Sequence, residues 1–166
     1  MEKKPSSNSR TVKTAQIFPP DANAYGTLFG GKLMAHIDDV AAIAAVRHAR
    51  QSVVTASTDS VDFLQPVKVG DSISIEGFVT YDHNTSMEVF IKVIKEGLLT
   101  AEKSVCATAF LTFVAFGEDG NPTVVPQVYP ETEQEKMLFE GAKLRRERRN
   151  ERRKESQRMA KLYGTE

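Results

Sequence analysis

The sequence lacks the features that mark several classes of protein. It has no tryptophan and a single cysteine, Cys106, among 166 residues. One cysteine can form no internal disulfide and no metal cluster by itself, so we expect a reducing compartment, most simply the cytoplasm. No apolar run reaches the roughly 18 residues of a typical membrane-spanning helix. The polar start MEKKPSSNSR is followed by no apolar segment, so we expect no secretory signal.

Neither sign of charge is in excess, but the two signs are unevenly distributed. The chain carries 22 basic and 22 acidic residues, yet residues 141–166 hold ten of the basic residues and only four of the acidic ones. The arginines surround a predicted helix instead of forming one stripe, and glutamates alternate with them at i, i+3 or i, i+4 spacing. No aromatic platform accompanies them, so we expect no nucleic-acid partner. The helix is either solvated or contacts the acidic body of a neighbouring subunit.

The hydrophobic pattern predicts a short strand, an apolar helix, four longer strands and a closing helix. The strands cover residues 11–18, 53–63, 72–81, 87–95 and 98–116, and the helices begin near residues 30 and 131. Thr132, with Glu135 three residues on, would form a capping box at the start of the closing helix. The turns between strands are short, with a tight hairpin expected at Glu96 and Gly97, which favours antiparallel neighbours. We divide the chain into a flexible segment (1–10), one domain (11–130) and a basic helical extension (131–166).

The first helix, predicted to end at Ala49, is too apolar to lie on the outside of a sheet. Leu33, Ile37 and Val40 recur at the spacing of one helical face. A curved antiparallel sheet that wraps this long central helix would bury it, and this α+β arrangement is the hotdog fold. A single subunit would leave sheet edges open, so we expect at least a dimer.

Two acids interrupt that helix, and a glycine pair opens it. In NAYGTLFGGKLMAHIDDVAAIAAV, Gly30 and Gly31 stand where better helix formers are usual, and Asp38 and Asp39 follow two turns later. Solvated acids on an amphipathic helix and packing glycines would explain these residues without any function. Asn23, upstream, is also a common turn residue.

This stretch, together with SVDFLQPVKVGDSISIEGFV and NTSMEVFIKV, resembles the bacterial single-module cytosolic acyl-CoA thioesterases of the hotdog superfamily. Mammalian brain-type acyl-CoA hydrolases share the module in duplicate. The resemblance covers about residues 10–131. It is carried by Asn23 with Gly26, by the sequence Phe29-Gly30-Gly31, and by an acid seven residues after the second glycine. Lys32 departs from the pattern, because relatives often have an apolar or aromatic residue there.

The resemblance implies roles for individual residues. The family's catalytic acid on the central helix matches Asp38, while Asp39 is one place out of register and is a helper, a dimer contact or a solvated charge. The family's loop asparagine matches Asn23. Duplicated relatives combine the acid of one module with the asparagine of the other. The resemblance therefore implies a homodimer with two composite sites, and a homohexamer built as a trimer of dimers.

The chemistry of thioester hydrolysis suits these residue types. Backbone N–H groups at a helix start are unpaired and lie at the positive end of the helix dipole. Without a Cβ, Gly30 and Gly31 would let a thioester carbonyl approach those groups, which would stabilise the oxyanion. A carboxylate buried in an apolar helix is a stronger base than one in water. Asp38 would activate a water molecule or attack the carbonyl directly, and the sequence does not choose between these.

Coenzyme A adds phosphates and an adenine to the substrate. The turn Asn84-Thr85-Ser86 and the basic residues Lys95 and Lys103 are candidates to bind them, since backbone N–H groups and hydroxyls in a turn suit phosphate oxygens. The same turn is equally explained as a simple hairpin. Because coenzyme A belongs to the substrate, we expect no separate cofactor and no metal.

Two other functions fit the same fold. A non-catalytic acyl-CoA sensor would use the basic helix as an output surface, and it would not need the acid on the central helix. A hydratase acting on unsaturated acyl-CoA would carry an Asp and His pair in a different motif, which we do not find. The leading prediction is hydrolysis of fatty acyl-CoA, with the preferred acyl chain length left open.

Overall fold

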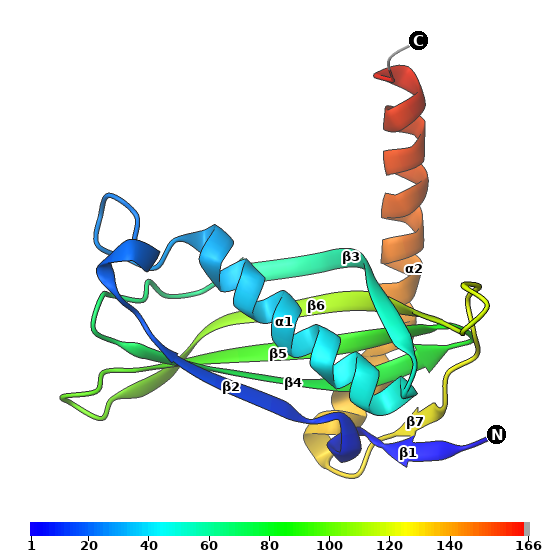
Figure 1. Ribbon diagram of the computed structural model, residues 1–166, viewed down its shortest axis with the longest axis horizontal. Helices are drawn as coiled ribbons and strands as arrows, with labels where there is room; N and C mark the ends of the chain where they lie inside the picture. Colours follow the sequence, from blue (N-terminus) through cyan, green and yellow to red (C-terminus); the bar gives the residue numbers. More distant parts are fainter. Residues whose placement is uncertain (165–166) are drawn as a thin grey trace.

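The computed structural model describes residues 1–164, and its helices and strands form a five-stranded sheet, a two-stranded sheet and two long helices (Figure 1). In chain order the elements are β1 (Lys3–Pro5), η1 (Ser6–Ser9), β2 (Thr11–Gln16), η2 (Pro19–Asp21), α1 (Gly30–Ala49), β3 (Ser52–Phe63), β4 (Ser72–His83), β5 (Ser86–Glu96), β6 (Lys103–Phe116), β7 (Gln127–Tyr129) and α2 (Glu133–Leu162). Thr165 and Glu166, the last two residues of the predicted extension, lie outside the described residues.

The large sheet separates the two helices. Its strand order is β2-β4-β5-β6-β3, and all neighbouring strands are antiparallel. Side chains alternate between its faces. Val89 and Ile91 of β5 are fully buried in the core beside α1, whereas Glu88 and Phe90 face α2. Figure 1 shows α1 across one face of the sheet and α2 behind the other. The predicted α+β hotdog class is confirmed.

The central helix α1 starts and ends where the sequence predicts. Its apolar face is buried against the sheet, and the chain leaves the helix through Arg50, whose left-handed conformation (φ 52°) is common just after a helix. The outer face of α1 stays open in a single copy, although it carries three large apolar side chains that are 40–46% exposed: Met34, Ile43 and Val46. One sheet therefore covers this helix on one side only.

The connection between β5 and β6 corrects the predicted tight hairpin at Glu96 and Gly97. A loop spans residues 97–102, and it is closed by a hydrogen bond from the Gly97 N–H to the Glu102 carbonyl (3.0 Å). The predicted strand from residue 98 accordingly begins only at Lys103. The apolar residues Leu98 and Leu99 favour a strand in the sequence pattern. Both side chains are exposed in the structure, so they lie in the loop and not in the strand.

The N-terminal segment, which the sequence predicts to be flexible, makes specific contacts. β1 pairs in parallel with β7, although more than 120 residues separate them in the chain. Ser9 is buried: its hydroxyl donates to the Ser6 carbonyl and accepts a hydrogen bond from the Val79 N–H, both at 2.8 Å. Polar composition suggested disorder, but these serines satisfy backbone groups of the turn and of β4.

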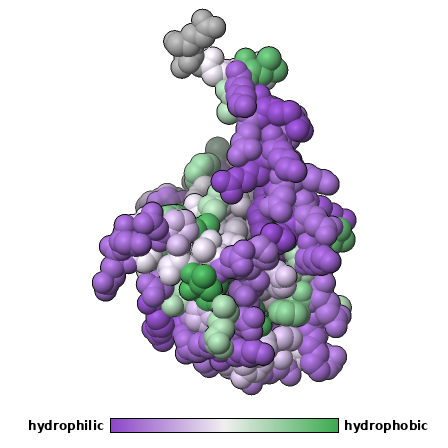
Figure 2. Space-filling view, turned by 90° about the vertical axis from the view of Figure 1, so that its right-hand side faces the viewer, coloured by the Kyte–Doolittle hydropathy of each residue, from purple (hydrophilic) through white to green (hydrophobic). Residues whose placement is uncertain are grey.

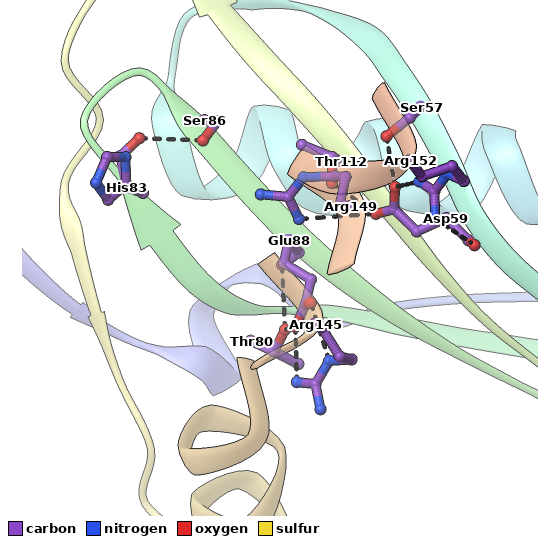
Figure 3. A network of polar contacts seen from close by, with 10 residues as sticks. All are labelled: Ser57, Asp59, Thr80, His83, Ser86, Glu88, Thr112, Arg145, Arg149 and Arg152. Carbon is purple, nitrogen blue, oxygen red and sulfur yellow. Dashed lines mark hydrogen bonds and ion pairs between the residues drawn. The ribbon is translucent and has the colours of Figure 1, made fainter. Parts of the chain in front are cut away.

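The closing helix α2 begins at the predicted capping box. The Thr132 hydroxyl accepts from the Glu135 N–H, and the Glu135 carboxylate accepts from the Thr132 N–H. The first half of α2 packs on the sheet through the buried Ala142 and a bidentate ion pair. In that pair, Arg145 donates to both carboxylate oxygens of the buried Glu88 at 2.8 and 3.0 Å (Figure 3).

Beyond Arg152, whose guanidinium still reaches Asp59 of β3, α2 projects past the sheet. Every described residue from 151 onward is exposed, and Figure 2 shows mostly hydrophilic side chains on the projecting part. No helix within residues 1–164 is long and apolar enough to cross a membrane.

Candidate active site

The loop that leads into α1 is organised around Asn23. Its side-chain oxygen accepts hydrogen bonds from the N–H groups of Tyr25 (3.0 Å) and Thr27 (3.2 Å), and its amide donates to the Thr27 hydroxyl (2.9 Å). The Gly26 N–H closes the turn on the Asn23 carbonyl, and Gly26 itself has a φ of +74°, which favours glycine. Asn23 is exposed. In one copy it therefore acts as a turn residue, with its side-chain oxygen already engaged.

The glycine pair opens α1 as the sequence predicts. Phe29 is the N-cap residue and provides no side-chain cap, and the first N–H groups to bond within the helix are those of Lys32 and Leu33. Within residues 1–164 the N–H groups of Gly30 and Gly31 have no acceptor. A Cβ on Gly31 would lie 2.6 Å from the Phe29 ring, so any larger residue at this position would collide with that ring. The helix start therefore presents two free donors of the kind that bind an oxyanion.

Asp38 lies on the third turn of α1 and faces the edge strand β3. Its Oδ1 accepts a 2.9 Å hydrogen bond from the Thr55 hydroxyl, and Oδ2 has no partner within residues 1–164. The sequence predicts a buried carboxylate at this position. In one copy of the chain, Asp38 is instead partly exposed. Sequence reasoning missed Thr55, because nothing in the local pattern of a β-branched strand distinguishes it from its neighbours.

Asp39 differs from Asp38 in its surroundings. It points away to β2, where Lys13 Nζ lies 3.1 Å from its carboxylate, and its side chain is exposed. His36 lies near this pair. Burial lowers the pKa of His36, which keeps its imidazole neutral at pH 7. Asp39 is thus one half of a surface ion pair, and His36 brings no positive charge to the helix.

The two halves of the predicted chemistry are too far apart within one copy. Asp38 follows Gly31 by seven residues, so its Cα lies about 10 Å farther along the helix axis. A reacting carbonyl must lie about 3 Å from both the attacking group and the oxyanion donors. Asp38 and the helix start of the same copy therefore do not act on the same carbonyl.

The structure also separates the predicted phosphate-binding residues. Asn84 has a φ of +52° in the β4–β5 turn, and the Ser86 hydroxyl donates to the His83 carbonyl (3.0 Å). Lys103, the first residue of β6, pairs with Glu96 at the far end of β5. Measured along β5, Glu96 is about 33 Å from Ser86. Lys95, near Lys103, donates to the Pro66 carbonyl (3.0 Å). The Asn84-Thr85-Ser86 turn and Lys103 of one copy cannot hold the same phosphate.

Comparison with known proteins identifies the family. The model of the thioesterase superfamily matches residues 25–102. An uncharacterized acyl-CoA thioester hydrolase of Bacillus subtilis is 52% identical over 158 residues, which are 95% of this chain and 92% of that protein. The chain belongs to the acyl-CoA thioester hydrolases of the thioesterase superfamily. The predicted hotdog acyl-CoA thioesterase family is thereby confirmed.

Solved structures of acyl-CoA hydrolases share the whole fold. The Staphylococcus aureus acyl-CoA hydrolase in complex with butyryl coenzyme A, coenzyme A and coenzyme A disulfide is 44% identical, with a TM-score of 0.93 over 98% of this chain and 99% of that one. It has also been solved with an aspartate, an asparagine or a threonine replaced by alanine. A hexameric acyl-CoA thioesterase is 49% identical, with a TM-score of 0.89 over 92% and 97% of the two chains.

The hydroxyl of Thr55 is expected to hold the Asp38 carboxylate in place for the reaction. Thr55→Val keeps the shape of the side chain and removes the hydroxyl, and a hydrogen bond to a charged group is worth about 1.5–3 kcal/mol. We expect kcat for butyryl-CoA to fall by about tenfold or more, with little change in KM. Thr55→Ser, which keeps the hydroxyl, should restore most of the rate. Equal losses in both variants would contradict the role of the hydroxyl.

Proposed function

We propose that the protein hydrolyses the thioester of fatty acyl-CoA to free coenzyme A and a carboxylic acid. The observation that carries this proposal is the pair of features on α1: a glycine start with two free N–H donors, and the partly exposed Asp38 oriented by Thr55. The names of its relatives support an acyl-CoA thioester as the substrate, and the Staphylococcus aureus complexes contain butyryl coenzyme A and coenzyme A.

Asp38 has one carboxylate oxygen available for chemistry. Oδ1 accepts from Thr55, which leaves Oδ2 to take a proton from water or to attack the thioester carbon. In the first route, water oxygen bonds to the carbonyl carbon, the C–S bond breaks, and coenzyme A leaves as a thiolate that regains a proton. In the second route, Oδ2 bonds to the thioester carbon and the same C–S bond breaks, which releases the coenzyme A thiolate and leaves a mixed anhydride on Asp38. Water then hydrolyses the anhydride to the carboxylic acid and restores the Asp38 carboxylate. Both routes need the same oxyanion donors.

A second copy of the chain supplies the missing half of each site. In this proposal Asp38 of one copy acts on a carbonyl that is held by Gly30, Gly31 and Asn23 of the other, since the two groups lie too far apart in one copy. The side-chain oxygen of Asn23 and one N–H of its amide are engaged in the turn, so the second amide N–H is the donor left for the substrate.

Two surfaces of the chain support this assembly. The edge strand β3 has no partner on its outer side within residues 1–164, and the outer face of α1 is apolar and open. Pairing two copies through β3 would bring both α1 helices together and cover these surfaces. The hexameric thioesterase among the similar structures supports a homohexamer of three such dimers. We also place the protein in the cytoplasm, where reducing conditions suit its free, buried Cys106.

The fatty acyl chain has a candidate pocket at the glycine pair. A cavity of about 350 Å³ adjoins Gly30 and is lined mostly by apolar side chains, chiefly those of Leu28, Leu33, Phe63 and Leu64. Burying methylene groups there would contribute about 0.8 kcal/mol each. We therefore expect affinity to rise with acyl chain length until the cavity is filled.

Thiol release from a panel of acyl-CoA thioesters tests the function. We expect turnover with at least one chain length, and a kcat/KM that rises with chain length before it levels off. Tight binding of acyl-CoA without any thiol release from the oligomer would overturn the proposal in favour of a sensor.

A further inference from the structure

The last part of α2 continues past the edge of the sheet. Arg152 lies 2.6 Å from Asp59 of the edge strand β3, and ten residues of the helix, 153–162, follow it. These residues extend about 15 Å farther. Figure 1 shows α2 running across the strands and continuing beyond β3. Helical segments of this length draw most of their stability from packing, so the projecting part of α2 (residues 153–162) calls for a surface that covers it.

One stripe of α2 faces the sheet wherever the two are in contact. Ala142 is buried, and Arg145 pairs with Glu88 of β5. Arg152 follows Arg145 by seven residues, which is two helical turns, and therefore lies on the same side of the helix. The spacing matches the sheet: seven residues rise about 10.5 Å, and β5 and β3 are two strand spacings, about 9.6 Å, apart.

The same stripe continues past β3 with apolar side chains. Met159 follows Arg152 by another seven residues. Leu162 and Tyr163 follow Met159 by three and four residues, so all three lie on the sheet-facing side. They are the only large apolar side chains in residues 151–164, and in one copy they are 48–80% exposed. This placement indicates that the stripe contacts a sheet that one copy of the chain does not provide.

The charge of this segment suits a second copy of the same chain. Residues 141–166 carry ten basic and four acidic side chains, whereas residues 1–140 carry 12 basic and 18 acidic ones. The acidic body of a neighbouring copy would therefore attract the basic end of α2. The projecting part also begins directly beside β3, which has no partner on its outer side within residues 1–164.

We propose that the projecting part of α2 packs across the dimer interface on the outer face of the partner's sheet. The packing depends on the pairing through β3 in the proposed function, because that pairing continues the sheet beneath the helix. Met159 lies two strand spacings past β3, just as Arg152 lies two spacings past β5. The first of these spacings reaches the partner's β3 and the second its β6, so Met159 contacts β6 of the partner. Because the pairing is two-fold, each copy holds the other in the same way.

Photocrosslinking of the assembled protein tests this contact. A benzophenone maleimide on Met159→Cys is expected to capture β6 or β3 of another copy, which oligomers assembled from isotope-labelled and unlabelled copies would reveal. Cys106 is buried, so the introduced thiol is the reactive one. Gln157→Cys is the matched control, since Gln157 is exposed and points to the opposite side of the helix, and it should capture neither strand. Ile43→Cys, on the outer face of α1, reports the β3 pairing independently by capturing α1 of another copy.

The three labels separate the possible outcomes. Capture from Ile43→Cys without capture from Met159→Cys would overturn the packing of α2 and leave the dimer intact. Failure of Ile43→Cys to capture another copy would remove the sheet beneath the helix, and the packing of α2 with it. Equal capture of the two strands from Met159→Cys and Gln157→Cys would also overturn the proposal. Thiol release from acyl-CoA, measured on the unlabelled wild type, reports the proposed hydrolysis separately.

A charge at the same position is expected to weaken the assembly. Met159→Glu would place a carboxylate against the partner's β6, and it should raise the dimer dissociation constant by at least about tenfold, as the loss of a buried Met side chain does. Gln157→Glu introduces the same charge on the exposed side and should stay within about twofold of the wild type. Analytical ultracentrifugation at increasing dilution measures both. Equal dissociation constants in the two variants, or binding to phosphatidylglycerol vesicles that Met159→Glu abolishes, would assign the apolar stripe to another surface and overturn the proposal.

Discussion

Replacing Asp38 by Asn is expected to lower kcat for butyryl-CoA by about 10²–10⁴-fold, the usual contribution of a general base. The amide keeps the size of the side chain and still accepts the Thr55 hydrogen bond through its oxygen, so the fold and the orientation should survive. What the variant loses is the negative charge at Oδ2. Thiol release measured on the purified oligomer gives kcat, and the thermal unfolding midpoint verifies stability.

Asp39→Asn is the matched control for this prediction. It changes the same chemical group one residue away, but Asp39 makes only an exposed ion pair with Lys13. Such pairs contribute about 0–1 kcal/mol, so turnover should stay within about twofold of the wild type. Near wild-type turnover in Asp38→Asn, or an equal loss in Asp39→Asn, would sink the role we assign to Asp38.

Mixed oligomers of two inactive variants are expected to recover activity. Asp38→Asn removes the base from one half of each site, and Asn23→Ala removes the amide from the other half. If each site takes Asp38 from one copy and Asn23 from its partner, a mixed dimer contains one intact site and one doubly altered site. Co-expression with random pairing makes half of the dimers mixed, so activity should return to roughly a quarter of the wild-type value.

The comparison that matters is between mixed and unmixed dimers. Separately purified variants, combined without subunit exchange, should stay as inactive as each alone. A co-expressed pair that recovers nothing, while mass measurements show that mixed dimers are present, would contradict the composite site. It would place Asp38 and Asn23 of one copy at the same substrate, against the distance that separates Asp38 from the start of α1.

Local signals in the sequence predicted much of this structure. The boundaries of α1 follow from its apolar spacing and its glycine start, and the start of α2 follows from the capping box of Thr132 and Glu135. These features depend on residues within one or two turns of each other. The hairpin predicted at Gly97 failed because Leu98 and Leu99 are apolar but exposed, and solvent exposure is not a local property.

Contacts across long stretches of sequence escaped prediction. Thr55 meets Asp38 from 17 residues away, and Asp59 meets Arg152 from 93 residues away. β1 and β7 pair although neither segment reads as a strand by itself. In each case the partner lies on an element whose position depends on the packing of the whole sheet.

The sequence by itself determined the family, the α+β class, the glycine-opened helix and the position of the acid on that helix. Only the tertiary structure decided that Asp38, held by Thr55, is available for chemistry while Asp39 is paired with Lys13. It alone showed that the helix start and Asp38 of one copy are too far apart to act together. The physical reason is that residue type and spacing fix local conformation, whereas partners and distances between elements are set by how the sheet and helices pack.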